Sequence, residues 1–229
     1  SLNRSFSAPV NIHLEQSSED LAHLARFETD PFSRWQALND LATRDLIAAT
    51  NAVRAGDGVQ CNPALVDSLL ATLGDDRLEP ALKGQALTMP GESDIAREIG
   101  SNIDPDAIHL ARERIITFIA EAGADLFSAI LSDTRPTGPF MPDAQGAGRR
   151  ALYLASLGYL SHGKMPAEEI LAIYDAADNM TIRSGALLVL AHEYPESVAA
   201  KKALVDFESR FSDNPLVIDK WMAIQATIP

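Results

Sequence analysis

One stretch near the middle of the chain constrains the fold more than any other. From Asp104 to about Leu131, apolar residues recur every three or four positions, which is the spacing that places side chains on one face of an α-helix. Asp104 can cap this helix, and Pro105 suits its first position. The apolar face is made by Ile108, Ala111, Ile115, Phe118, Ile119, Ala122, Leu126 and Ile130. The pattern predicts one long helix whose apolar face is covered by other helices.

Start and stop signals of the same kind recur along the sequence. Asp30-Pro31 and Asn62-Pro63 each place a capping side chain before a proline, and Gly56 suits a helix end. The loops between the segments are short, so neighbouring helices are expected to be antiparallel. The predicted helices begin at residue 17 or 18 and continue over residues 31–55, 62–73, 80–87, 92–99, 104–131, 144–161, 166–177, 181–194, 195–211 and 215–226.

These helices are expected to pack as irregular pairs. They differ in length and follow no fixed repeat of the tetratricopeptide or ankyrin type. Such an arrangement is typical of an irregular superhelical stack of antiparallel helix pairs, similar to armadillo and HEAT arrays. The predicted fold class is therefore all-α, with residues 17–229 forming the helical domain.

The first residues carry a different pattern. Val10, Ile12 and Leu14 alternate with polar residues, which predicts a strand with one buried face. One strand cannot fold without a partner, so residues 1–16 are expected to be the terminal strand of a truncated β domain. The chain opens with Ser1 and stops abruptly at Pro229, and we expect a piece of a longer protein, with the helical domain itself truncated at its C-terminal end.

Charge and hydropathy exclude several classes of function. The formal net charge of −13 disfavours binding to nucleic acid or to an anionic membrane surface. The short basic pairs of the sequence are interpreted as solvated helix faces. The longest apolar run, residues 186–191, is far too short for a membrane span. The single cysteine, Cys61, is typical of a protein from a reducing compartment.

No catalytic or metal site is predicted within the chain. A zinc peptidase needs two histidines one helical turn apart, and no two of His13, His23, His109, His162 and His192 lie four positions apart. The sequence from His192 to Glu196 begins as His-Glu but has glutamate where the second histidine should be. We therefore predict no catalytic, cofactor-binding or metal-ligating residue, and interpret His192 as an ordinary histidine at a helix end.

Four other features have weaker functional interpretations. Cys61 precedes the Asn62 cap, where a helix N-terminus can lower the pKa of a thiol, but no partner for it is identifiable. Residues 146–150 superficially resemble a phosphate loop and are interpreted as a helix start. The pairs at residues 75–76 and 168–169 are interpreted as carboxylates for solubility and helix-dipole stabilisation. Trp35 and Trp221 are interpreted as core or interdomain anchors.

Several short motifs occur in one order over nearly the whole chain. They are SLNRSFSAPV at residues 1–10, DPFSRW at 30–35, LTMP at 87–90, NIDP at 102–105, ADNMT at 177–181, PLVIDKW at 215–221 and QAT at 225–227. Together they resemble the bacterial aminopeptidase N family of M1 (gluzincin) zinc metallo-aminopeptidases. Residues 1–10 resemble the last strand region of that family's small β-sandwich domain, and the later motifs resemble its C-terminal helical domain.

The resemblance implies a large cytoplasmic enzyme that releases N-terminal amino acids from peptides. Its zinc would be held by a His-Glu-x-x-His motif and a later Glu, and a Gly-x-Met-Glu-Asn motif would hold the substrate amine. Neither motif occurs in this sequence, so no catalytic or metal residue is carried over. The helical domain would pack on the parent's own catalytic and β-sandwich domains and enclose the active-site cavity. This segment alone is expected to be inactive and to bind no zinc.

Two alternatives remain open at this stage. The chain could be a stand-alone helical-repeat scaffold that binds a protein partner on a concave face. The strand predicted at residues 10–14 disfavours that interpretation, because it would lack a sheet. An enzyme that uses Cys61 as a nucleophile is the least favoured reading.

Overall fold

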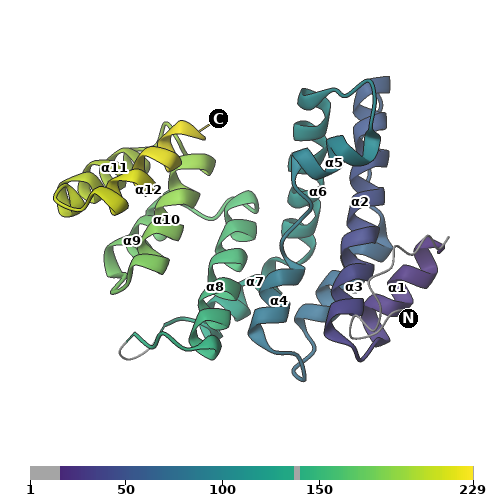
Figure 1. Cartoon of the computed structure of the whole chain (residues 1–229), viewed down its shortest axis with the longest axis horizontal. Coiled ribbons are helices and arrows are strands. Elements are labelled where there is room, and N and C mark those ends of the chain that lie inside the picture. The colour runs from purple at the N-terminus through teal and green to yellow at the C-terminus, as the bar shows by residue number, and fades with distance from the viewer. Residues whose placement is uncertain (1–15, 137–139, 229) are drawn as a thin grey trace. The chain divides into compact units, whose positions relative to one another are not determined.

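The computed structural model describes residues 16–136 and 140–228, and this part of the chain consists of helices joined by loops (Figure 1). Between these limits it contains twelve α-helices and no strand, which confirms the predicted all-α class. The strand predicted at residues 10–14, and with it the predicted domain of residues 1–16, lies outside the described residues.

The helices fall into two compact units, Ser1–Leu126 and Phe127–Pro229. The first unit holds α1 (Ser18–Phe27), α2 (Pro31–Ala55), α3 (Pro63–Leu73), α4 (Pro80–Ala86), α5 (Glu92–Ile99) and α6 (Pro105–Ala122). Helix α7 (Ala124–Asp133) begins just before the boundary. The second unit continues with α8 (Ala144–His162), α9 (Ala167–Ala176), α10 (Met180–Glu193), α11 (Val198–Phe211) and α12 (Pro215–Ala226).

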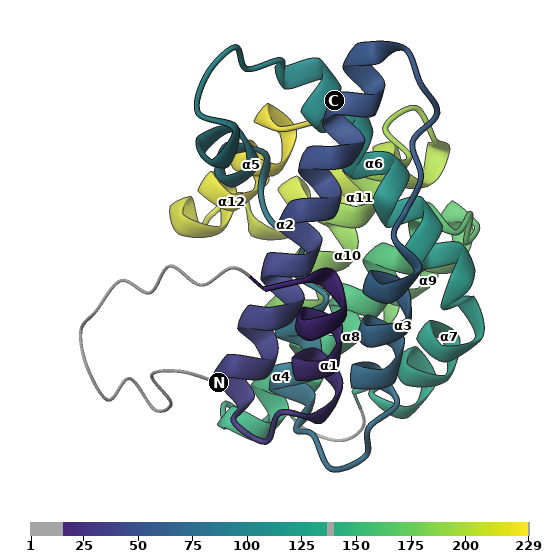
Figure 2. The same ribbon diagram turned by 90° about the vertical axis from the view of Figure 1, so that its right-hand side faces the viewer.

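Helix α2 is the centre of the first unit. It begins where the Asp30 carboxylate accepts the Ser33 N–H at 2.8 Å, and it ends at Gly56, whose φ of 77° favours glycine. Helices α1, α3, α4, α5 and α6 all contact it, and Figure 1 shows α6 running beside it. Figure 2 shows α1 and α3 close to α2. The core that α2 supplies consists of Ala37, Leu38, Leu41, Ala42, Leu46 and Ala49.

The long helix predicted from Asp104 to Leu131 is in fact two helices. Helix α6 ends at Ala122, Gly123 leaves the helical conformation with φ −104° and ψ 9°, and α7 begins at Ala124. The prediction was wrong at this point because the apolar spacing continues through the break, whereas one glycine is enough to interrupt the helix. Phe127 and Ile130 of α7 are still buried. The apolar spacing therefore predicted the burial of these residues correctly, but it was wrong to place them on one continuous helix with α6.

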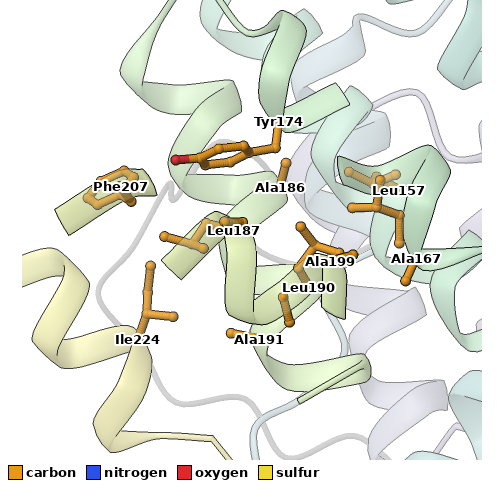
Figure 3. Close-up of a cluster of buried hydrophobic side chains, with 13 residues drawn as sticks. Leu157, Ala167, Tyr174, Ala186, Leu187, Leu190, Ala191, Ala199, Phe207 and Ile224 are labelled. Carbon is orange, nitrogen blue, oxygen red and sulfur yellow. The ribbon is translucent and has the colours of Figure 1, made fainter. Parts of the chain in front are cut away.

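Helix α10 is the centre of the second unit. It contacts α8, α9, α11 and α12, and it contributes Ala186, Leu187, Leu190 and Ala191 to the main core cluster. Figure 3 shows these side chains meeting Tyr174 from α9, Phe207 from α11 and Ile224 from α12. The face of α10 that carries these alanines and leucines thus packs against the surrounding helices.

Most predicted helix boundaries agree with the structure to within one residue. The exception besides α6 and α7 is α11, which begins at Val198 rather than at Pro195, because Ser197 supplies the cap by accepting the Ala200 N–H at 3.0 Å. Within the described residues no single helix is long and apolar enough to cross a membrane, although the bent α6–α7 pair passes that test jointly.

Candidate functional site

The histidines of the described chain are separated from one another. No group of three or more His, Cys, Asp or Glu side chains within residues 16–136 and 140–228 could hold a metal ion. His192, at the end of α10, lies 3.3 Å from the Ile224 carbonyl oxygen and 3.1 Å from the Thr227 hydroxyl through its Nε2 atom. These contacts fasten the end of α12 to α10. His13 lies outside the described residues.

Cys61 is half-buried and lies beside a buried carboxylate. Asp45 of α2 accepts the Asn62 N–H at 3.2 and 3.1 Å, which holds the loop before α3 against α2. Burial, together with the neighbouring Asp45 charge, raises the pKa of the Cys61 thiol to about 12. A thiol in that environment stays protonated, so the geometry opposes a nucleophilic role.

The glycine-rich segment at residues 146–150 opens α8, as the sequence predicts. Asp143 caps the helix by accepting the Gly146 N–H at 2.6 Å. Arg149 donates to the Asp133 carbonyl oxygen at 2.7 Å, and Arg150 donates to the Met141 carbonyl oxygen at 3.1 Å. Both arginines therefore hold backbone carbonyls of adjacent segments.

Asp75 has a more specific role than its sequence interpretation gave it. Its carboxylate lies 3.2 Å from Nη1 of Arg34, and the two side chains are 11% and 5% exposed. Hydrogen bonds from Arg77, and then from Arg34, hold the pKa of Asp75 well below its usual range against the opposing effect of burial. The pair joins α2 to the loop after α3, a contact that sequence spacing does not reveal. Asp76 has no such contact among the described residues.

The two tryptophans behave as anchors within their own units. Trp35 packs 5.6 Å from the ring of Phe32 and borders a small apolar hollow with Leu38 and Met89. Trp221 of α12 packs on the main core cluster of the second unit and donates from Nε1 to the Leu204 carbonyl oxygen at 2.9 Å.

A polar network that the sequence did not reveal ties α9, α10 and α11 together. The Tyr174 hydroxyl donates to the Asp206 carboxylate at 2.8 Å, and Arg210 donates to the same oxygen at 2.6 Å. Arg183 lies over the Tyr174 ring and donates to the carbonyl oxygens of Tyr174 and Ala177. Burial alone would raise the pKa of Asp206, but the hydrogen bonds from Arg210 and Tyr174 outweigh it and lower that pKa. The network links the three helices through hydrogen bonds made among their own residues.

One groove in the second unit has the composition of a binding site. It has a volume of about 520 Å³ and is bordered by α7, α8 and α9 and the turns that follow α7 and α8. Its walls combine apolar and polar side chains, among them Leu131, Leu160, Met165, Ile173, Tyr153 and Arg135. A pocket of this size, mostly apolar with a few polar groups, is typical of ligand sites in proteins. It is the strongest candidate site that the described residues offer, and nothing in its sequence pattern identified it.

Glu169 also borders the groove, although sequence analysis assigned the pair Glu168-Glu169 to dipole stabilisation alone. Both glutamates do lie in the first turn of α9, as that interpretation requires. Glu169 therefore lies both at the N-terminus of α9 and at the border of the groove.

Comparison with known proteins assigns a family to the helical fold. The chain is 39% identical to an aminopeptidase N of Caulobacter vibrioides over 99% of its own length and 26% of the relative's length. It is 29% identical to aminopeptidase N of Escherichia coli, over 98% of this chain and 26% of the relative's length. It is 30% identical to aminopeptidase N of Haemophilus influenzae, over 98% of this chain and 25% of the relative's length. The chain thus spans about a quarter of the length of the curated relatives it matches.

The structural comparison agrees with the sequence comparison. The crystal structure of Legionella pneumophila aminopeptidase A in complex with aspartic acid matches 99% of this chain and 27% of its own chain, with a TM-score of 0.81 and 25% identity. These matches confirm the resemblance to the aminopeptidase N family that the motifs predicted. The family described as "Domain of unknown function (DUF3458_C) ARM repeats" matches residues 18–229. The chain therefore belongs to this family of ARM-repeat domains.

Proposed function

We propose that the chain is the non-catalytic C-terminal helical domain of a zinc-dependent aminopeptidase of the M1 class. The observation that carries the proposal is the coverage: aminopeptidase N relatives match 98–99% of this chain, while the chain spans only 25–26% of their length. A helical domain of that proportion is one module of a larger enzyme. The enzyme would release N-terminal amino acids from peptides, and we place it in the cytoplasm.

The zinc ion of such an enzyme would be held outside this chain. The described residues offer no cluster of His, Cys, Asp or Glu that fits a zinc ion, so no catalytic step is assigned to them. The ligands would come from the parent's catalytic domain. This segment by itself would then neither bind zinc nor hydrolyse peptides.

The role of the domain would be architectural. It would pack on the catalytic and β-sandwich domains of the same protein and enclose the active-site cavity. An enclosed cavity excludes bulk water and so strengthens the electrostatic contacts made to a charged substrate terminus. It would also admit peptides and exclude folded proteins.

Activity measurements on two proteins test the proposal. We expect the whole protein to hydrolyse alanyl-p-nitroanilide and to lose that activity to a chelator, with recovery on addition of zinc. We expect the purified 229-residue chain to show no hydrolysis with or without zinc. Zinc-dependent hydrolysis by the chain alone would contradict the proposal, as would a whole protein without aminopeptidase activity.

The groove of the second unit favours a second candidate, a stand-alone helical-repeat scaffold that binds a protein partner. The coding DNA on either side of the segment distinguishes the two. An upstream frame that encodes Gly-x-Met-Glu-Asn followed by His-Glu-x-x-His supports the enzyme. A start codon just before Ser1 and a stop codon after Pro229 would leave only the scaffold.

A further inference from the structure

Tyr153 is one of the residues that line the groove between α7, α8 and α9. Tyr153 is 4% exposed, and its hydroxyl makes no hydrogen bond with any described residue. A tyrosine hydroxyl beside a groove can donate a hydrogen bond to a group that binds there. Burial raises the pKa of Tyr153, so the hydroxyl keeps its proton near neutral pH and can donate it in a hydrogen bond.

A second donor, Arg135, lines the same groove. Arg135 follows α7, and within the described residues its guanidinium makes neither an ion pair nor a hydrogen bond. Its positive charge acts on the Tyr153 hydroxyl, where it opposes part of the rise in pKa caused by burial. Both donors line the same groove, and together they suit a carboxylate.

The other residues of the groove indicate which kind of molecule carries the carboxylate. Leu131, Leu160, Met165 and Ile173 supply apolar surface, and the volume of about 520 Å³ accommodates a large side chain. Glu169, on α9, also borders the groove. A carboxylate there disfavours a second negative charge and can accept a hydrogen bond from an amide N–H.

We propose that this groove binds the carboxyl-terminal residue of a peptide, with its α-carboxylate held by Arg135 and Tyr153 and its apolar side chain packed against Leu131, Met165 and Ile173. The α-carboxylate, the large apolar side chain and the adjacent amide of such a residue match the three features of the groove. This inference is independent of the proposed function, because it concerns the binding of a peptide carboxyl terminus and includes no chemical step.

Calorimetric titration with blocked peptides tests the groove. The probe is N-acetyl-Ala-Ala-Leu, which lacks the free amine that an aminopeptidase acts on, and its comparison is the same peptide with a carboxyl-terminal amide. We expect the carboxylate to bind the full chain at least about tenfold more tightly than the amide, because charge-assisted hydrogen bonds to the carboxylate are lost. Arg135→Gln and Tyr153→Phe should each remove most of that difference.

A matched control separates the groove from general charge effects. Lys201 is an exposed cation of α11 that pairs with Glu196 at 2.9 Å, so Lys201→Gln removes one positive charge without touching the groove. This variant should bind both peptides as the unaltered chain does. Decanoate, an apolar carboxylate without an amide, should bind at least about tenfold more weakly than the peptide.

Four results would overturn the inference. The first is equal affinity for the carboxylate and the amide, and the second is an unchanged preference for the carboxylate in Arg135→Gln. The third is a loss of that preference in Lys201→Gln equal to the loss in Arg135→Gln. The fourth is binding of decanoate as tight as that of the peptide. Absence of any binding at millimolar peptide would overturn it as well. Circular dichroism of each variant confirms that the helices are retained.

Discussion

A β-carbon placed on Gly185 would lie 2.6 Å from both terminal methyl carbons of Leu154. Helices α8 and α10 therefore approach each other at a position where only a hydrogen atom fits. Leu154 is partly buried and packs against the main core cluster of the second unit, so a shift of its side chain would disturb that packing. We predict that Gly185→Ala lowers the free energy of unfolding by about 1 kcal/mol, because overpacking exceeds the gain in helix propensity.

The control for that prediction lies in α8. A β-carbon at Gly158 would meet no atom within 4 Å, so Gly158→Ala should raise the free energy of unfolding by about 0.5–1 kcal/mol through helix propensity alone. Urea denaturation followed by circular dichroism measures both variants. In a Leu154→Ala background, Gly185→Ala should become neutral or stabilising. A similar loss of stability in both backgrounds would show that the Leu154 contact is not the cause.

The buried pair of Arg34 and Asp75 predicts that Asp75→Ala lowers stability more than Arg77→Ala does. Asp75→Ala leaves the Arg34 guanidinium buried without its counter-charge, which is strongly unfavourable. Arg77 also pairs with Asp75, but its side chain is 85% exposed, so Arg77→Ala removes a solvent-screened contact. We expect a clearly larger fall in the midpoint of thermal unfolding for Asp75→Ala. Equal falls in the two variants would contradict the assignment of Asp75 to Arg34.

The contacts of Asp206 predict a dependence of stability on pH. Because its pKa is lower in the folded protein than in the unfolded chain, ionised Asp206 stabilises the fold above about pH 4 and loses that contribution as the pH falls through its folded value. Asp206→Asn should reduce the free energy of unfolding by about 1 kcal/mol at pH 7, and the difference should shrink towards pH 3. Asp219→Asn, which removes an exposed carboxylate of α12 outside this network, controls for the loss of one negative charge. A constant difference from pH 7 to pH 3 would refute the prediction.

The environment of Cys61 predicts that its thiol reacts slowly with alkylating reagents. With its pKa raised to about 12, only about one thiol in ten thousand is ionised at pH 8. Alkylation by iodoacetamide should therefore be at least tenfold slower in the folded chain than in urea. Asp45→Asn removes the neighbouring negative charge and should accelerate the reaction. Rapid alkylation of the folded chain would restore the nucleophilic interpretation of this cysteine.

Sequence patterns located the helices well where local chemistry decides them. Pro31 with its Asp30 cap and the left-handed Gly56 fix both ends of α2, and these signals are complete within a few residues. Gly123 misled the prediction, because a glycine inside an apolar pattern is compatible with either a continuous or a broken helix. The choice depends on how α7 packs, which is a tertiary property.

The candidate site was beyond the reach of sequence patterns. Tyr153 and Arg135 are 18 positions apart, and the loop between them falls partly outside the described residues. Sequence identified neither residue, because a tyrosine in an amphipathic helix is usually core and an arginine after a helix is usually solvated. Only the groove that both residues line marks them as a pair.

The position of α10 at the centre of the second unit has a consequence for how that unit opens. Since α8, α9, α11 and α12 all contact α10, a fluctuation that loosens α10 removes packing from all four at once. We therefore expect the amides of α8 to α11 to exchange with deuterium in one cooperative event, rather than pair by pair as in a linear array of repeats. The second unit should act as a single foldon, so any ligand that closes the groove on α8 should slow exchange even in the distant α11.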